Sequence, residues 1–309
     1  MPLTGPGSID TLSYEEYKGN LQILLQQKAS KFRGTGIIES VSGRGAQVLE
    51  QIGTVDSSEI AGRHGDTPIT TTNYERRWVN PSELEVANLA DKLDDLKNIS
   101  DPRGRLVQVQ AARLGRDLDD IILAGLGGNN QTGTSGTTAT GFNGDNIIAA
   151  GGTKFTIDKL REVQEKMRDN DVDMDGMEQV TALISPQMAR HLLEQTEYTS
   201  ADFAAVKALV DGGIGSFMGF NFIVSNRVPG ASKYNTGVID VDKDINIAAN
   251  TQRAFFYPQS GLCIGMWKDV DVDVSIRNDK RNSTQIYSWM VAGATRTEEN
   301  KVYAVDVAV

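Results

Sequence analysis

The sequence has few of the side chains that enzymes and metalloproteins use for chemistry. It contains one cysteine, Cys263, and two histidines, His64 and His191, among 309 residues. A single cysteine excludes an internal disulfide framework and fits a reducing cytoplasm, and its apolar neighbours predict a buried, inert thiol. Neither histidine has a second ligand at metal-binding spacing, so we expect His64 on a solvated loop and His191 on a helix surface.

The sequence also lacks long apolar runs and any excess of positive charge. No stretch approaches the roughly 18 apolar residues of a membrane span, and the N-terminal residues have neither a basic start nor an apolar segment. We therefore expect neither export by a standard signal nor a membrane partner. The formal net charge is −10. This charge argues against a protein that recognises nucleic acid, because such proteins have a basic surface patch. It is compatible with a container that encloses nucleic acid without binding it tightly.

Three patterns that suggest chemistry fail on closer reading. Asp171, Asp173, Asp175 and Gly176 match the first half of a calcium loop, but Ala182 stands where the bidentate Glu is needed, which favours a solvated acidic turn. The glycines at 212, 213, 215 and 219 follow a predicted helix rather than a strand, so a dinucleotide cradle is excluded.

The third pattern is an acidic cluster that a carboxylate hydrolase could use. Helical spacing from Leu118 and Ile121 predicts that Asp117, Asp119 and Asp120 lie on the solvated side of their helix. The sequence thus predicts no catalytic residue, no metal site, no cofactor and no enzymatic activity.

What the sequence does contain is one unusually long amphipathic helix, predicted over residues 102–126. Asp101 and Pro102 suit its first turn, and Gly127 and Gly128 supply its stop. Its apolar residues recur three and four positions apart: Val107, Ala111, Leu114, Leu118, Ile121 and Ile122. At about 1.5 Å per residue the helix is roughly 37 Å long, which is more than a compact domain usually needs.

Upstream of this helix, residues 41–80 predict a long hairpin. The flanks at 46–49 and 76–79 read as strands, and the polar segment 54–74 between them has a Gly-rich tip near 62–65. A two-stranded ribbon without a core is barely stable alone in water, so it needs a surface to lie on. A floppy surface loop is the alternative interpretation of the same polarity.

The rest of the sequence predicts a mixed α+β protein. Residues 127–144 read as a Gly- and Thr-rich loop and a domain hinge. Helices are predicted at 155–170, from 185 onward and at 202–210, with strands at 180–185 and 220–224 between them. The last forty residues alternate apolar and acidic or polar positions, as strands do.

The order of four of these segments resembles that of tailed-bacteriophage major capsid proteins with the Hong Kong 97 fold. The segments are the extended run 76–90, the acidic turn 91–96, the helix ending at 116–122, and the later motif at 201–203 with the glycines at 212–215 and Gly219-Phe220. The resemblance covers about 150 residues. It implies an N-terminal arm, an extended hairpin loop, a peripheral domain carrying a spine helix, and an axial domain.

From this resemblance we expect the following division of the chain: arm 1–40, hairpin 41–80, peripheral domain with spine helix 81–150, axial domain 151–268, and C-terminal strands 269–309 returning to the peripheral domain beneath the helix. The expected function is a major capsid protein that assembles in the host cytoplasm into an icosahedral virion head of hexamers and pentamers enclosing double-stranded DNA.

The expected partners are copies of itself, a separate scaffolding protein, a portal protein, and DNA held without sequence-specific contacts. The shell protein of a bacterial protein-cargo nanocompartment, which has the same fold, is the alternative. Candidate intersubunit contacts lie at the root and tip of the hairpin: Arg76, Arg77, Trp78, Arg63, His64 and Asp66.

Overall fold

The computed structural model describes residues 27–53, 55–59, 62, 69–72, 74–90, 103–174, 178–195, 216–230, 245, 247–248 and 250–308. Several predicted features lie outside these residues: the arm before Gln27, most of the hairpin tip, the acidic turn at 91–96, the helix at 202–210 and the glycines at 212–215. Within the described residues the strands form three sheets, and the mixture of helices and strands confirms the α+β class.

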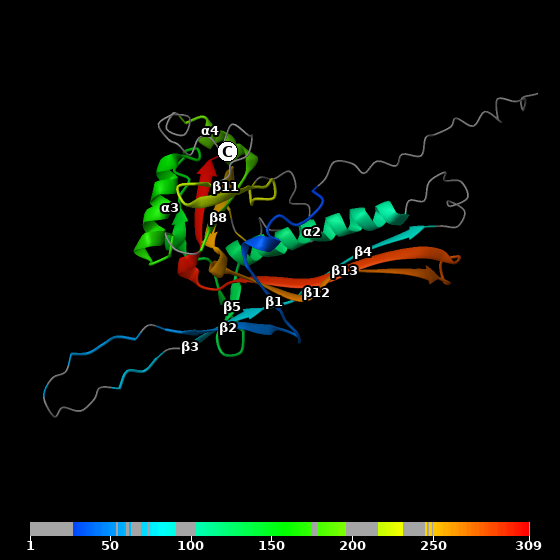
Figure 1. Ribbon diagram of the computed structural model, residues 1–309, viewed down its shortest axis with the longest axis horizontal. Coiled ribbons are helices and arrows are strands. Elements are labelled where there is room, and N and C mark those ends of the chain that lie inside the picture. The colour runs from blue at the N-terminus through cyan, green and yellow to red at the C-terminus, as the bar shows by residue number, and fades with distance from the viewer. Residues whose placement is uncertain are drawn as a thin grey trace, which may run out of the picture.

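The predicted long helix is confirmed as α2, Arg103–Gly127, which has 25 residues. Its predicted start at Asp101 and Pro102 lies outside the described residues. The helix lies along a four-stranded sheet, which we call the spine sheet, and contacts mainly β13 and β4 (Figure 1). In spatial order the spine sheet contains β1 (Ile37–Ser40), β12 (Leu262–Arg277), β13 (Ser283–Arg296) and β4 (Ser82–Ala90).

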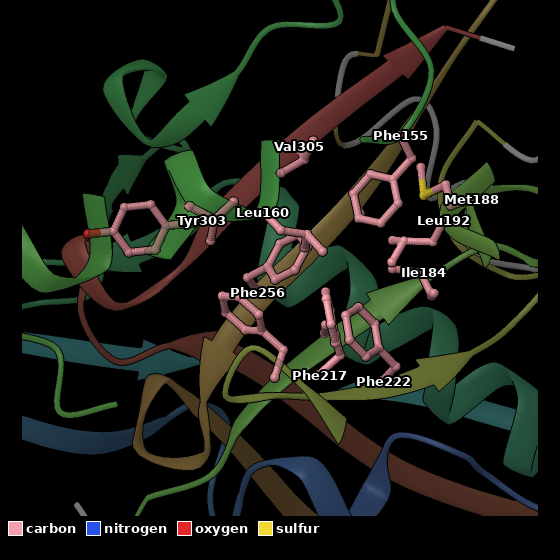
Figure 2. Packing of buried hydrophobic residues seen from close by; sticks show 14 of the residues in the cluster. Phe155, Leu160, Ile184, Met188, Leu192, Phe217, Phe222, Phe256, Tyr303 and Val305 are labelled. Carbon is pink, nitrogen blue, oxygen red and sulfur yellow. The ribbon is translucent and has the colours of Figure 1, made fainter. Parts of the chain in front are cut away.

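A second sheet, which we call the axial sheet, has six strands. In spatial order these are β7 (Ile147–Ile148), β14 (Tyr303–Ala308), β11 (Thr251–Pro258), β8 (Val180–Ile184), β10 (Phe220–Val224) and β9 (Ser216–Phe217). The helices α3 (Ile157–Asp169) and α4 (Pro186–Leu193) cover one face (Figure 1). Their buried side chains interlock with those of the sheet, as Figure 2 shows for Leu160, Met188 and Phe256.

Both helices begin where the sequence supplies a cap. The side chain of Thr156 accepts a hydrogen bond from the backbone N–H of Lys159, and that of Ser185 accepts one from Met188. Pro186 occupies the first turn of α4, where no backbone donor is required. The predictions of these two helices, and of the strands at 180–184 and 220–224, are confirmed.

The two faces of the axial sheet belong to two different hydrophobic clusters. Along β11, Ala254 and Phe256 pack with α3 and α4, whereas Phe255 and Tyr257 pack with the C-terminal part of α2. Successive residues of a strand point to opposite faces, so one strand can serve both clusters. The axial sheet therefore joins the core under α2 to the core under α3 and α4.

The predicted hairpin is present as β2 (Ala46–Ile52) and β3 (Tyr74–Val79), paired antiparallel. The interpretation of residues 127–144 as a loop was wrong in part, because they contain β5 (Asn130–Thr132) and β6 (Thr138–Thr140). These strands extend the hairpin into a four-stranded sheet in the order β2-β3-β5-β6, the hairpin sheet. Short strands of this kind gain their stability from a distant partner, here β3, which local sequence does not reveal.

The C-terminal strands divide between two sheets, which corrects the expected path of residues 269–309. β12 and β13 do lie beneath α2, in the spine sheet. β14 instead pairs with β11 and β7 in the axial sheet, where Tyr303, Val305 and Val307 pack with α3. The alternating pattern predicted the strand correctly, but period-two alternation does not specify which sheet receives it.

Candidate intersubunit interface

Two adjacent arginines at the root of the hairpin have different surroundings. Arg76 is half-buried, with 39% of its side chain exposed, and forms a 3.0 Å ion pair with Glu50 on the paired strand. Arg77 is only 5% exposed, and its Nη1 donates to Glu299 at 2.9 Å within the same chain. Alternation along β3 explains the difference, because neighbouring side chains point to opposite faces of the ribbon. Arg76 is therefore available to a neighbour, whereas Arg77 is occupied inside its own subunit.

Glu299 connects Arg77 to the end of the long helix through Arg296. Arg296 Nε donates to Glu299 at 2.9 Å, and its Nη1 donates to the carbonyls of Leu126 and Gly128 at 2.7 and 2.8 Å. Burial lowers the pKa of Arg296, with the Glu299 carboxylate opposing that effect. A cation at a helix C-terminus satisfies carbonyls that have no partner in the helix and suits the helix dipole. These contacts hold the hairpin root against the C-terminal end of α2.

Trp78 fixes the second contact of the hairpin root. Its indole Nε1 donates to the carbonyl of Gly133 at 2.8 Å, in the turn between β5 and β6. A Cβ at Gly136 would lie 2.7 Å from the Trp78 ring, and Gly136 has a φ of +66°. Glycine is therefore required at this position for both space and backbone conformation.

Exposed large apolar side chains in the described residues include two groups of three or more, besides Ile37 and Ile38 on β1 and Leu89 on β4. The first, the hairpin patch, consists of Ile52, Val55, Ile69 and Tyr74. Ile52 and Tyr74 lie directly opposite each other on β2 and β3 and are 68% and 72% exposed. The second, the strand row, consists of Val272, Val274 and Ile276 on β12. Figure 1 shows the hairpin and the outer end of β12 at opposite ends of the molecule.

The strand row is the uncovered part of a face that α2 covers elsewhere. By register, Val272 and Val274 lie beside Ser288 and Ile286 of β13, which are buried against α2. Exposure rises outward along β12, from 37% at Val272 to 56% at Val274 and 62% at Ile276. The alternation is visible in the sequence, but the exposure of these side chains is not, because the width of the sheet relative to the helix decides which strand is covered.

The same part of β12 is also an edge. β1 pairs with β12 only over residues 263–266, and no other described strand pairs with that side of residues 270–277. An apolar edge strand is a template for contact with another chain, although the N–H groups of Val270 and Val272 already donate to Asp269 and Asp271. Apolar side chains and an open edge therefore occur together at this end of the molecule.

Two expectations about polar residues were wrong. Asp117, Asp119 and Asp120 are all buried rather than solvated, because residues 27–32 and Arg227 pack against that side of α2. Burial raises the pKa of Asp120 to about 6, with the Arg227 guanidinium opposing that rise. His191 is also buried, on α4, and its pKa is lowered by burial first and by the nearby charges of Lys154 and Arg190.

Cys263 is buried as expected, and burial, with the charge of Glu39, raises the pKa of its thiol to about 12. In the described part of the chain no three His, Cys, Asp or Glu residues are grouped to hold a metal ion. Asp175 and Gly176 of the calcium-like turn, and the candidate contacts Arg63, His64 and Asp66, lie outside that part. None of the described helices is both long and apolar enough to cross a membrane.

Comparison with known structures shows what kind of fold this is. The chain superposes on the capsid structure of Cyanophage P-SCSP1u with a TM-score of 0.73 at 14% identity, covering 100% of this chain and 96% of that one. It matches the mature capsid of bacteriophage PhiM1 with a TM-score of 0.68 at 15% identity, over 95% and 91% of the two chains. The capsid of Helicobacter pylori bacteriophage KHP30 gives 0.69 at 13% identity, over 100% and 99%.

The family model for phage capsid proteins matches residues 9–309. The chain therefore belongs to the phage capsid protein family, and it is a structural protein of the virion shell. No curated protein matches the sequence significantly. The family match favours a phage head over the nanocompartment alternative, and the fold is the Hong Kong 97 type that the sequence resemblance implied.

Proposed function

We propose that this chain is the main subunit of an icosahedral head, in which hexamers and pentamers of it enclose double-stranded DNA. The observation that carries this proposal is the pair of exposed apolar surfaces, the hairpin patch and the strand row. They lie at opposite ends of the molecule, so they cannot cover each other within one subunit, and another copy of the chain can cover both (Figure 1). Repeated burial of modest apolar areas around closed rings sums to a stable lattice.

The hairpin root gives these contacts a fixed direction. The ion pairs from Arg77 through Glu299 to Arg296 hold the ribbon to the end of α2. Arg76 on the outer side of the ribbon, Trp78 at its root, and the tip residues Arg63, His64 and Asp66 are the proposed contact positions. Arg77 acts through its own subunit by positioning the ribbon.

The charge of the chain fits DNA that is enclosed but not recognised. With 41 acidic and 31 basic residues, the subunit supplies no net basic surface for phosphate binding. We therefore propose packaged DNA without sequence-specific contacts, a portal protein for its entry, and no catalytic role for the shell subunit. Free subunits expose apolar side chains before assembly, and a separate scaffolding protein would cover them until the shell closes. We also propose that assembly takes place in the host cytoplasm.

A pair of lysine substitutions tests the role of the hairpin patch. Tyr74→Lys places a charge on the exposed apolar face of the ribbon. Glu75→Lys introduces a lysine at the next position, whose side chain points to the opposite face of the ribbon. We expect Tyr74→Lys to give folded subunits that do not form shells, and Glu75→Lys to form them. Normal shells from Tyr74→Lys in electron micrographs would contradict the proposal.

The contents of the particle test the kind of shell. Particles purified from the producing cells are expected to protect double-stranded DNA from nuclease. A dedicated protein cargo in place of DNA would instead support the nanocompartment.

A further inference from the structure

Three buried aspartates on α2, Asp117, Asp119 and Asp120, form a cluster that we call the acidic triplet. Each carboxylate has its partners in a different part of the molecule. Asp117 pairs with Arg113, one turn earlier in the same helix, at 2.8 Å. Asp120 forms a bidentate ion pair with Arg227, which follows β10. Asp119 binds the N-terminal segment that begins at Gln27.

The contacts of Asp119 are the most numerous of the three. Its Oδ1 accepts hydrogen bonds from the hydroxyl of Ser30 at 2.5 Å and from the backbone N–H groups of Lys31 and Phe32 at 3.0 and 3.2 Å. Its Oδ2 accepts a hydrogen bond from the side-chain amide of Gln27 at 2.5 Å. Hydrogen bonds to an ionised carboxylate are about twice as strong as neutral ones. One side chain thus holds four donors of the segment.

Packing around these contacts leaves the segment a single path across α2. A Cβ at Gly115 would lie 3.0 Å from the backbone nitrogen of Ser30, so the chain crosses the helix closely at Gly115. Phe32 is fully buried with Leu114 and Leu118 in the core beneath the helix. The crossing is therefore set by a glycine, a buried ring and directed bonds to the backbone of the segment. Asp119 accepts from the N–H groups of Lys31 and Phe32, and Arg116 donates to the carbonyl of Gln27 at 3.0 Å.

We propose that Asp119 is a positioning residue that fixes the path of residues 27–32 across α2. Residues before Gln27 start from a point that this carboxylate holds against the spine helix. Any intersubunit contact made by those residues therefore starts from a fixed point, a consequence that rests on the proposed shell function.

The acidic triplet provides its own control for the test. Asp119→Asn keeps the shape of the side chain but removes its charge and turns one acceptor into a donor facing the Gln27 amide. Asp117→Asn makes the same change two positions earlier, where the partner is Arg113 of the same helix. We expect amide hydrogen exchange of Lys31 and Phe32 to become about tenfold faster in Asp119→Asn. In Asp117→Asn it should stay at the wild-type rate.

These rates are measured on unassembled subunits, so they stand whether or not the wild-type chain forms shells. Unchanged exchange at Lys31 and Phe32 in Asp119→Asn would overturn the proposal, as would equal acceleration in both variants. If Asp119→Asn does not fold, Ser30→Ala removes one donor and leaves α2 intact. It should accelerate exchange at the same two amides, and wild-type rates there would also overturn the proposal.

The consequence for assembly has a separate readout. Asp119→Asn subunits are expected to form particles of mixed size, while Asp117→Asn subunits form particles of the wild-type size. Uniform wild-type particles from Asp119→Asn, despite faster exchange, would overturn the role of this contact in assembly. A wild-type chain that forms no particles at all would instead count against the proposed function.

Discussion

The axial sheet and the spine sheet differ in how their faces are covered. All five residues of β8, at the centre of the axial sheet, are buried, because α3 and α4 cover one face and α2 the other. In the spine sheet, α2 covers β13 and β4 but leaves the outer half of β12 uncovered. A sheet that buries both faces stabilises its own subunit. A sheet with an uncovered apolar row has apolar surface that becomes buried only when subunits associate.

The largest effect is expected from a charged side chain in the core that packs against both sheets. Leu114 is fully buried on α2, and Leu114→Asp would bury an unpaired charge there. We expect no folded subunit, seen as insoluble expression and the absence of a cooperative thermal transition. A soluble variant with a wild-type melting curve would show that α2 is not part of the core.

A cavity in the axial sheet should be costly but tolerated by the fold. Phe256 is fully buried and its ring lies 5.2 Å from that of Phe220, in an edge-to-face arrangement. Phe256→Ala is expected to lower the free energy of unfolding by about 3–5 kcal/mol in urea titrations. Val272→Ala, on the spine sheet, is the control and should cost less than about 1 kcal/mol because the side chain is already partly exposed.

The strand row should affect assembly without affecting the subunit. Val274→Asp places a charge on an exposed position, so the free energy of unfolding is expected to change by less than about 0.5 kcal/mol. The same subunits should fail to form shells in electron micrographs. Ser275→Asp, one position along on the opposite face of β12, is the control and should assemble. Normal shells from Val274→Asp would show that the row is not an interface.

The smallest expected effect is a difference in alkylation rate between cysteines at two positions of β12. Cys263 lies where β1 covers β12, and its thiol pKa of about 12 leaves almost no thiolate at pH 8. Alkylation of Cys263 in the unassembled subunit should be at least about a hundredfold slower than that of Val274→Cys in a Cys263→Ala background. Comparable rates would mean that the covered and uncovered halves of β12 open equally often.

The sequence predicted best the elements that carry their own signal. The 25 residues of α2 have a long apolar periodicity and a glycine stop, and the observed end at Gly127 lies one residue beyond the predicted one. α4 was predicted from Ser185 and Pro186, which form its cap. The hairpin strands were predicted from composition on both sides of a polar segment.

What the sequence could not predict depends on partners distant in the chain. β5 and β6 exist because β3 pairs with β5, and β14 joins the axial sheet because β11 lies beside it. The acidic triplet was assigned to solvent because helical spacing places it away from Leu118, but the N-terminal segment and Arg227 close over that side. Amphipathic spacing predicts one buried face and says nothing about a second.

The continuity of α2 has a mechanical consequence. One unbroken helix of about 37 Å packs on the spine sheet along its length and beneath the axial sheet at its C-terminal end. A tilt of about 5° at one end displaces the other by roughly 3 Å, because a helix of this length behaves as a stiff rod over small angles. The two sheets therefore cannot turn independently, and a load applied to either one is shared through the backbone hydrogen bonds of the helix.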